Sequence, residues 1–321
     1  MSRALIAGAN GFVGAHLARL LASEPGLELF GSVYSPGAVS FGISDERTFT
    51  CDVLDLQAVM DMIGQVRPDR IFNLAGQADV ARSWEDPACT IEVNLLGPLH
   101  LVQAILKLVP RCRLLLVGSA NVYGRVSEAD CPIAEDAPLA PASPYAVSKA
   151  AQELLAAQYH MSHDLQVVGV RPFNHIGPGQ SEHFIVGRLA KSIAEIEAGL
   201  APPVLRIGDL TAKRDFTDVR DVARAYVLLM ERGVPGEIYN VASGRAVQIK
   251  ALVEMALSLA KVKIELKADS ARARPLDLPL LVGDSSRLTR ATGWRPTIPL
   301  ERSLADAIDH ARAQVGAARS A

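Results

Sequence analysis

The composition and charge of the chain are those of an ordinary globular protein, and they exclude several classes of function. Among its 321 residues, 49% are hydrophobic and 21% are charged, which leaves room for one large domain or two ordinary ones. The net charge of −2 lacks the basic excess of a nucleic-acid-binding protein. The four cysteines are scattered without zinc spacing, and no apolar run reaches the ~18 residues of a membrane span. We therefore expect no metal, nucleic acid or membrane partner, and a reducing, cytoplasmic setting.

A glycine-rich turn near the start of the chain indicates a phosphate-binding site. The apolar residues 4–7 predict a buried parallel strand, and residues 15–22 predict a helix. Gly8, Gly11 and Gly14 lie between them, with the spacing G-x-x-G-x-x-G rather than G-x-G-x-x-G. Glycines let a backbone approach a pyrophosphate closely, and a helix N-terminus offers free N–H groups and a positive dipole end. The order of strand, glycine turn and helix therefore predicts dinucleotide binding.

The second predicted strand, over residues 27–33, bears on the choice of cofactor. A site that prefers NAD places Asp or Glu at the end of this strand, where the acid hydrogen-bonds the ribose 2′-OH. Tyr34 and Ser35 follow the strand here, so no acid repels a 2′-phosphate and no arginine grips one. The sequence thus slightly favours NADP(H) as the cofactor, while NAD(H) stays possible.

Polar or small residues follow three more predicted strands, over residues 48–53, 70–76 and 113–117. Asp52, near the end of the first, can accept a hydrogen bond from an adenine amino group or act as an acid before the next helix. Ser119 follows the third strand, at the carboxyl edge where open parallel sheets bind their ligands. These positions are the candidate contacts of a ligand lying along one edge of the sheet.

A tyrosine and a lysine stand four residues apart at the start of a predicted helix. Ser143 is a suitable N-cap, and Pro144 fits the first helical position, where its missing N–H costs nothing. Tyr145 and Lys149 then share one face of the helix. An ammonium beside a phenol favours the phenolate and lowers its pKa, so Tyr145 is a candidate acid/base near neutral pH. The same spacing also arises by chance in helices, so its weight depends on the other motifs.

The order of elements predicts a two-lobed architecture. Strands alternate with helices from residue 4 to 175, which predicts an α/β fold with a doubly wound parallel Rossmann sheet. After Asn174 the elements become short and mixed, which predicts a smaller C-terminal α/β lobe that binds the substrate. Trp294 is expected to pack inside the smaller lobe, and residues 314–321 are expected to fray. We assign the dinucleotide-binding domain to residues 1–174 with 219–243 returning to it, and the substrate-binding lobe to residues 175–218 and 244–321.

With these pieces in place, the chain resembles the nucleotide-sugar branch of the extended short-chain dehydrogenase/reductase family. The matching motifs are spread over nearly the whole chain, and their order carries the resemblance. They are the Gly8/Gly11/Gly14 turn, Asp52-Val53, Asn73-Leu74-Ala75, Ser119 with Val122-Tyr123-Gly124, Tyr145 with Lys149, Arg171-Pro172-Phe173-Asn174, Arg214-Asp215-Phe216-Thr217-Asp218-Val219 and Gly293-Trp294-Arg295-Pro296.

Within this branch, residues 174–180 and 274–279 look most like those of reductases of GDP-linked 6-deoxy-4-keto-mannose, which are similar to GDP-mannose 4,6-dehydratases. Sugar 4,6-dehydratases carry an acid pair, or Ser-Glu, directly after the catalytic Ser or Thr, and the Glu abstracts the C5 proton. Ala120 and Asn121 occupy these two positions here. Because an amide cannot act as that base, the departure argues for a simple ketone reduction.

The resemblance implies a complete set of roles for the site residues. Hydride passes from NAD(P)H to the C4 ketone of a GDP-linked 6-deoxy-4-keto-hexose, with GDP-D-rhamnose as the expected product. Tyr145 donates the proton, Lys149 holds the nicotinamide ribose, and Ser119 hydrogen-bonds the ketone oxygen. The implied cofactor contacts are Gly8, Asn10, Gly11, Phe12, Val13, Gly14, Asp52, Val53, Leu74, Ala75, Gly76, Asn94, Tyr145, Lys149 and Pro172. The implied substrate contacts are Ser119, Asn121, Asn174, Arg214 and Arg274.

The family also implies a homodimer formed through two helices of each subunit, here residues 89–109 and 144–161. Apolar side chains that could line this seam, or pack on the sheet instead, are Leu95, Leu99, Leu154 and Leu155.

Three other functions fit the same motifs. A nucleotide-sugar 4-epimerase uses the same serine, tyrosine and lysine but keeps its cofactor bound, and it usually prefers NAD. A reductase of the opposite stereochemistry would form GDP-6-deoxy-talose. A dinucleotide-binding regulator would keep the fold without the chemistry.

Overall fold

The protein is described by a computed structural model, which covers residues 2–35, 42–268 and 278–320. Its larger part is built on a seven-stranded sheet in the order β10-β6-β5-β4-β1-β2-β3, with every neighbouring pair parallel. The strands are β1 (Ser2–Ala7), β2 (Leu27–Val33), β3 (Thr48–Thr50), β4 (Arg70–Asn73), β5 (Arg113–Val117), β6 (Val167–Pro172) and β10 (Ile238–Val241). This strand order is that of a doubly wound Rossmann sheet, in which the chain builds outward first on one side of β1 and then on the other. It confirms the predicted fold class.

Helices cover both faces of this sheet, so its strands are buried on each side. One face carries α1 (Phe12–Leu21), α8 (Val219–Arg232) and α10 (Ser286–Thr292). The other face carries α2 (Leu56–Val66), α5 (Gly97–Leu108) and α6 (Pro144–His163). The elements α8 and β10 thus belong to the layers of the large sheet although they follow residue 218, as the predicted domain division requires. That division itself stays a prediction.

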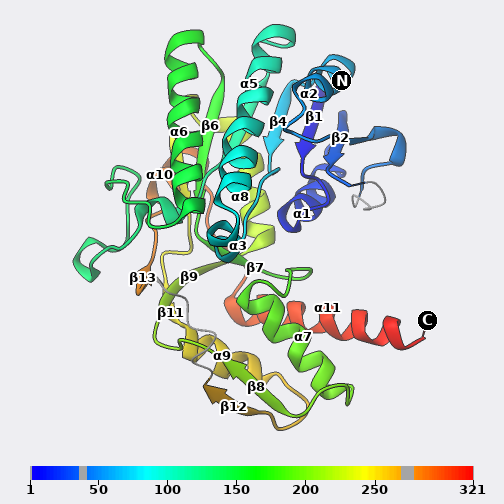
Figure 1. The fold of residues 1–321 in the computed structure, drawn as a ribbon, viewed down its shortest axis with the longest axis vertical. Helices are drawn as coiled ribbons and strands as arrows, with labels where there is room; N and C mark the ends of the chain where they lie inside the picture. The colour runs from blue at the N-terminus through cyan, green and yellow to red at the C-terminus, as the bar shows by residue number, and fades with distance from the viewer. Residues whose placement is uncertain (1, 36–41, 269–277, 321) are drawn as a thin grey trace.

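The smaller part of the molecule lies beyond the carboxyl edge of the large sheet (Figure 1). Its four-stranded sheet contains β7 (Asn174–Ile176), β9 (Lys213–Asp218), β11 (Ala246–Gln248) and β13 (Leu280–Leu281). A second ribbon pairs β8 (Val204–Ile207) with β12 (Glu265–Ala268). The helices α7 (Ile185–Glu197), α9 (Ile249–Ser258) and α11 (Leu300–Ser320) enclose a separate hydrophobic core with these strands. Residues 314–320 continue α11, so the expected fraying is wrong: Val315 packs against this core and extends the helix.

The predicted long helix over residues 89–109 is observed as one rod from Pro87 to Leu108 with an irregular middle. It consists of α4 (Pro87–Ile91), a π-helical segment η2 (Glu92–Leu96) and α5. The rod is long and apolar enough to cross a membrane, with a mean hydropathy of 1.4, but 44% of that window is buried inside the protein. Its α5 part packs on the sheet, so we interpret it as a core helix. π-Helical turns often mark functional sites, and this one carries Asn94.

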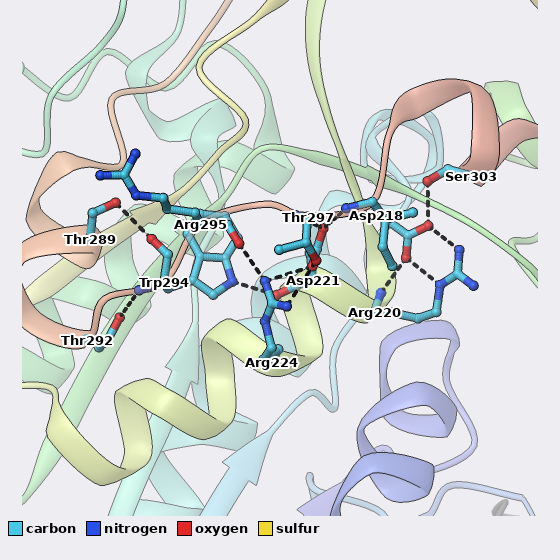
Figure 2. A network of polar contacts seen from close by, with 11 residues as sticks. Asp218, Arg220, Asp221, Arg224, Thr289, Thr292, Trp294, Arg295, Thr297 and Ser303 are labelled. Atoms are coloured by element: carbon cyan, nitrogen blue, oxygen red, sulfur yellow. Dashed lines mark hydrogen bonds and ion pairs between the residues drawn. The ribbon is translucent and has the colours of Figure 1, made fainter.

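Trp294 belongs to the core of the large sheet, and the expectation that it packs inside the smaller lobe is wrong. Its side chain is buried against α8, and Nε1 donates to the carbonyl of Asp221 at 2.9 Å (Figure 2). The carboxylate of Asp221 accepts from the backbone N–H groups of Thr297 at 2.7 Å and Ile298 at 2.9 Å. These bonds lay the chain after α10 across α8, which is why the tryptophan reaches the main core rather than the lobe.

A second carboxylate at the start of α8 ties the two parts of the molecule together (Figure 2). Asp218 ends β9 and caps α8, accepting from the N–H of Arg220 at 2.8 Å. It also forms an ion pair with the Arg220 side chain and accepts from the hydroxyl of Ser303 on α11. The motif around residues 214–219 therefore serves the junction between the sheet and the smaller lobe.

Candidate active site

The glycine turn after β1 is packed so closely that two of its glycines leave no room for a side chain. Gly8 has a φ of +82°, and a Cβ there would lie 2.9 Å from the backbone nitrogen of Ala75. A Cβ on Gly14 would lie 2.4 Å from the carbonyl oxygen of Gly8. The N–H groups of Gly8 and Ala9 both donate to the carbonyl of Ser32 in β2, at 3.0 and 2.9 Å. The turn is thereby fixed across the ends of β1, β2 and β4.

The helix that follows this turn begins without a protein cap. Gly11 is its exposed N-cap residue, no side chain among the described residues bonds the first N–H groups, and no acid lies in the first turn. A helix start of this kind presents unpaired donors and a positive dipole end, which suits a pyrophosphate. Asn10 is exposed beside it and Val13 is half-buried. This part of the chain therefore fits the phosphates of the dinucleotide predicted from the sequence.

Phe12, the first residue of α1, joins the turn to the smaller lobe. Its ring stacks on that of His175 at 6.0 Å with an angle of 9° between the planes, and it meets the ring of His16 edge-on. Burial lowers the pKa of both histidines. His16 Nε2 bonds the carbonyl of Pro178 at 2.9 Å, and His175 Nδ1 bonds that of Phe173 at 3.1 Å. His175 thus takes part in the packing between the glycine turn and the smaller lobe.

The predicted contacts Asp52 and Val53 follow β3, at the same carboxyl edge of the sheet. Asp52 is half-buried and accepts from the N–H of Leu54 at 2.9 Å, while the N-cap of α2 is Asp55. The alternative that Asp52 is the acid at the N-terminus of α2 is therefore wrong. The contact of Asp52 with an adenine amino group stays a prediction. Val53 is buried, and a Cβ on Gly97 would come within 2.8 Å of it.

Asn94 lies behind the end of β4 and is completely buried. Its Oδ1 accepts from the N–H of Gln77 at 2.9 Å, and its Nδ2 donates to the Gln77 carbonyl and to Ser148 Oγ, each at 3.0 Å. The neighbouring Gly76 is held so close that a Cβ would lie 2.9 Å from Asn94 Oδ1 and 3.7 Å from Lys149 Nζ. Asn94 thus fastens the Leu74–Ala75–Gly76 loop to α6, and both ends of its amide are occupied by protein groups.

The helix α6 begins as the sequence predicts and delivers Tyr145 and Lys149 to the end of β5. Ser143 Oγ accepts from the N–H of Ala146 at 3.1 Å, and Pro144 occupies the first turn. Both functional side chains are buried on the helix face that meets the sheet. Ser119 follows β5, and its side chain lies close enough to the Tyr145 phenol to offset part of the rise that burial causes in the phenol pKa. The structure therefore brings the three predicted catalytic residues together.

The ammonium of Lys149 is held by neutral oxygen atoms. Its Nζ donates to the carbonyl of Val117 at 2.8 Å and to Gln152 Oε1 at 3.3 Å. Burial lowers the pKa of Lys149 to about 8, although the nearby charge of Glu153 acts in the opposite direction. The lysine therefore changes its charge within the pH range in which enzymes are ordinarily assayed.

The pKa of Tyr145 corrects the prediction that Lys149 lowers it. Burial raises the pKa of Tyr145, and the hydrogen bond from Ser119 offsets only part of that effect. The reason is that the phenol is desolvated, while the ammonium bonds Val117 and Gln152 instead. A phenol that keeps its proton is suited to donating it, as the reduction of a ketone requires.

The predicted substrate residues lie after β5 and on two strands of the smaller sheet. Asn121 is half-buried, and its N–H donates to Ser119 Oγ at 3.2 Å. Asn174 is exposed on β7 and pairs with Phe216 of β9, while Arg214 is half-buried on β9 and donates to the carbonyl of Lys213. Asn174 and Arg214 thus lie on neighbouring strands. Arg274 lies outside the described residues, and Pro172 is buried at the end of β6, beside β10.

A buried ion pair beneath the site was missed by sequence reasoning. Glu153 Oε2 accepts from Arg171 Nε at 3.0 Å and Nη2 at 2.9 Å, and each side chain is 5% exposed. Arg171 Nη1 also donates to the hydroxyl of Tyr123 at 2.9 Å. Glu153 Oε1 lies 2.3 Å from where a Cβ on Gly118 would be, so a side chain at position 118 would displace the Glu153 carboxylate. The sequence did contain a sign of this ion pair, because Glu153 is a charged residue on the otherwise apolar inner face of the predicted helix.

Comparison with known proteins agrees with this geometry. The family model described as GDP-mannose 4,6 dehydratase matches residues 5–307. A GDP-6-deoxy-D-mannose reductase from Pseudomonas aeruginosa is 37% identical over 302 residues, which cover 94% of each chain. A GDP-mannose 4,6-dehydratase from Sinorhizobium fredii is 28% identical over 324 residues, which cover 91% of each chain.

Two solved structures have the same fold over nearly their whole length. The structure of RMD from Pseudomonas aeruginosa complexed with NADPH has a TM-score of 0.87 at 36% identity and covers 98% of this chain and 100% of that one. The UDP-glucose 4-epimerase of Thermus thermophilus complexed with NAD has a TM-score of 0.85 at 30% identity, with coverages of 97% and 99%.

The fold, the glycine turn and the Ser119, Tyr145 and Lys149 cluster define an extended short-chain dehydrogenase/reductase with a nicotinamide-dinucleotide site. Within that class, the chain belongs to the GDP-mannose 4,6-dehydratase family, whose model matches it almost from end to end.

The depressed pKa of Lys149 predicts a pH dependence. Because the lysine is charged below its pKa of about 8 and neutral above it, kcat/KM should fall as the pH rises through that value. The fall should approach tenfold per pH unit, since one proton is lost. A pH–rate profile from pH 6 to 10 checks this, and a constant kcat/KM up to pH 10 would contradict it.

Proposed function

We propose that this chain uses NAD(P)H to reduce the C4 ketone of GDP-4-keto-6-deoxy-D-mannose, giving GDP-D-rhamnose. The observation that carries the proposal is that the buried side chains of Ser119, Tyr145 and Lys149 come together at the end of β5, beside a segment without a base. The segment η3 (Ala120–Tyr123) has no acid in its first turn, and Asn121 stands where the resembling dehydratases have Glu. The 37%-identical relative named GDP-6-deoxy-D-mannose reductase supports the same substrate.

The side chains divide the work of such a reduction. The cofactor supplies the hydride when it is bound. Ser119 Oγ orients the ketone oxygen, and Tyr145 donates its proton to that oxygen as negative charge develops there. A donor pair that is already aimed at this position lowers the barrier without reorganising. Lys149, through its ammonium, holds the nicotinamide ribose and keeps a positive charge near the developing alkoxide.

The residues that follow β2 favour NADP(H) over NAD(H) as the cofactor. Tyr34, which follows β2, is 73% exposed, and neither it nor Ser35 carries a negative charge that would repel a 2′-phosphate. The similar structure complexed with NADPH supports this choice. We also infer a cytoplasmic site of action, where NADPH is available and thiols stay reduced, because all four cysteines are free.

A 4-epimerase is the second candidate, favoured by the likeness to the UDP-glucose 4-epimerase of Thermus thermophilus at 30% identity. It would use the same three side chains. Purified protein that carries bound NAD and interconverts C4 epimers without added cofactor would favour it over the reductase.

The proposal predicts a specific reaction. GDP-4-keto-6-deoxy-D-mannose, generated in situ by a dehydratase, should be consumed together with NADPH, and NMR should identify the rhamno product rather than the talo epimer. Tyr145→Phe should lower kcat by about 10²–10⁴-fold, the usual contribution of a positioned acid, with NADPH affinity unchanged. Tyr159→Phe, on the same helix, is the matched control and should stay near wild type.

Two outcomes would overturn this assignment. If neither NADPH nor NADH is consumed, the protein is not this reductase, and bound cofactor without turnover would favour a regulator. If Tyr145→Phe keeps turnover within about threefold of wild type, the tyrosine is not the proton donor.

We further propose that the protein is a homodimer assembled through α6 and the helix before α5. Val147, Leu154 and Met161 recur every seven residues on α6 and are 45%, 65% and 79% exposed. Ile91 and Leu96 on the neighbouring rod are 41% and 39% exposed. An apolar stripe on two adjacent helices can cover itself in a second copy related by a twofold axis. Of the residues expected at this seam, Leu154 is exposed, while Leu95, Leu99 and Leu155 are half-buried.

This assembly predicts that Leu154→Glu with Met161→Glu gives a folded monomer, because two charges would have to be buried in the seam. Light scattering coupled to gel filtration measures the mass. Val262→Glu, at an apolar residue 42% exposed in the smaller lobe, is the control and should stay dimeric. A wild-type monomer at micromolar concentration would refute the proposal.

A further inference from the structure

Gln152 is a polar side chain inside α6 to which the mechanism above gives no task. It is 1% exposed and lies one helical turn after Lys149. Its Nε2 donates to the carbonyl of Val117 at 2.8 Å, and its Oε1 accepts from Lys149 Nζ at 3.3 Å. Lys149 Nζ donates to the same carbonyl at 2.8 Å. The amide, the ammonium and the carbonyl therefore form a closed triangle at the end of β5, two residues before Ser119.

We propose that Gln152 is a positioning residue that fixes the Lys149 ammonium on the Val117 carbonyl and sets the pH range over which this charge persists. The inference rests on the proposed role of Lys149 in holding the cofactor. It goes further because it assigns the orientation and the charge of the lysine to a residue that does not itself touch a reacting atom.

The chemistry of an amide explains why this position holds glutamine. The triangle needs a donor toward the Val117 carbonyl and an acceptor toward the ammonium, and an amide supplies both. A carboxylate accepts only, so it would lose the bond to Val117. It would also place a negative charge in contact with the ammonium and favour the charged lysine. A leucine or methionine would fill the space but give the ammonium one acceptor fewer.

None of the charged or titratable groups described around the triangle is hydrogen-bonded to the Lys149 ammonium. Glu153, the next residue on α6, is bound through Oε2 to Arg171 on β6, and its charge acts on the lysine from outside hydrogen-bond range. For Tyr145, on the same helix face, Ser119 and not Lys149 acts to lower the pKa that burial raises. Among the described residues, the ion pairs of the site join Glu153 to Arg171 and not to Lys149. The direct partners of the ammonium are thus neutral, and one of them is Gln152.

The test compares Gln152→Glu and Gln152→Met with Gln158→Met, an exposed glutamine on the same helix. Two pH profiles are measured for each: kcat/KM with the keto sugar, and NADPH affinity by fluorescence titration without the sugar. Gln152→Glu should move the alkaline fall upward by about one pH unit or more, because a contacting carboxylate stabilises the ammonium. Gln152→Met should move it downward and reduce kcat about tenfold, with the KM for the sugar within about threefold. Gln158→Met should do neither.

Circular dichroism and thermal melting establish that each variant is folded, and Gln152→Met carries the test alone if Gln152→Glu does not fold. Alkaline limbs that stay at the wild-type pH in every folded variant at position 152 would overturn the proposal, since a residue that only packs would leave them there. The NADPH titration separates this failure from that of the proposed function, because it needs no sugar turnover.

Discussion

The site depends on one carbonyl oxygen, that of Val117 at the end of β5. The ammonium of Lys149 and the amide of Gln152 both donate to it at 2.8 Å, so α6 is fixed against the strand that delivers Ser119. The same helix carries Tyr145, whose pKa burial raises and the nearby Ser119 lowers in part. Because backbone carbonyls of a buried sheet cannot move independently, this attachment sets the relative positions of all three functional side chains. The Glu153–Arg171 ion pair supports the same junction from β6.

Burial, more than charge pairing, determines the protonation states in this site. It keeps the phenol of Tyr145 neutral by raising its pKa, and it brings the pKa of Lys149 down to about 8. The raised pKa of Tyr145 keeps the proton that the phenol must give to the ketone oxygen. The lowered pKa of Lys149 instead limits the pH range in which the lysine stays charged beside that oxygen. A dehydratase of the same fold needs a further base, and position 121 holds an amide instead. A protonated Tyr145 and the lack of a base at position 121 thus favour ketone reduction over dehydration.

Much of this arrangement could be predicted from sequence because it depends on local patterns. The strands over 27–33 and 113–117, the Ser143 cap and the glycine turn follow from periodicity, capping and backbone sterics, and all were confirmed. What could not be predicted depends on tertiary packing. The core position of Trp294 is decided by bonds to Asp221, and the pKa of Tyr145 by the depth of its burial. A helical spacing shows that two side chains share a face, but not where an ammonium on that face directs its protons.

The central claim is that Tyr145 acts as an acid because the folded protein keeps its phenol protonated. Carbon-13 NMR of tyrosine labelled at Cζ measures this directly, with the Tyr145 signal assigned by its absence from Tyr145→Phe. The account predicts that this signal stays at the neutral-phenol position as the pH is raised from 7 to beyond 10, the ordinary tyrosine pKa. A phenolate signal that appears near pH 7 in the free protein would contradict it.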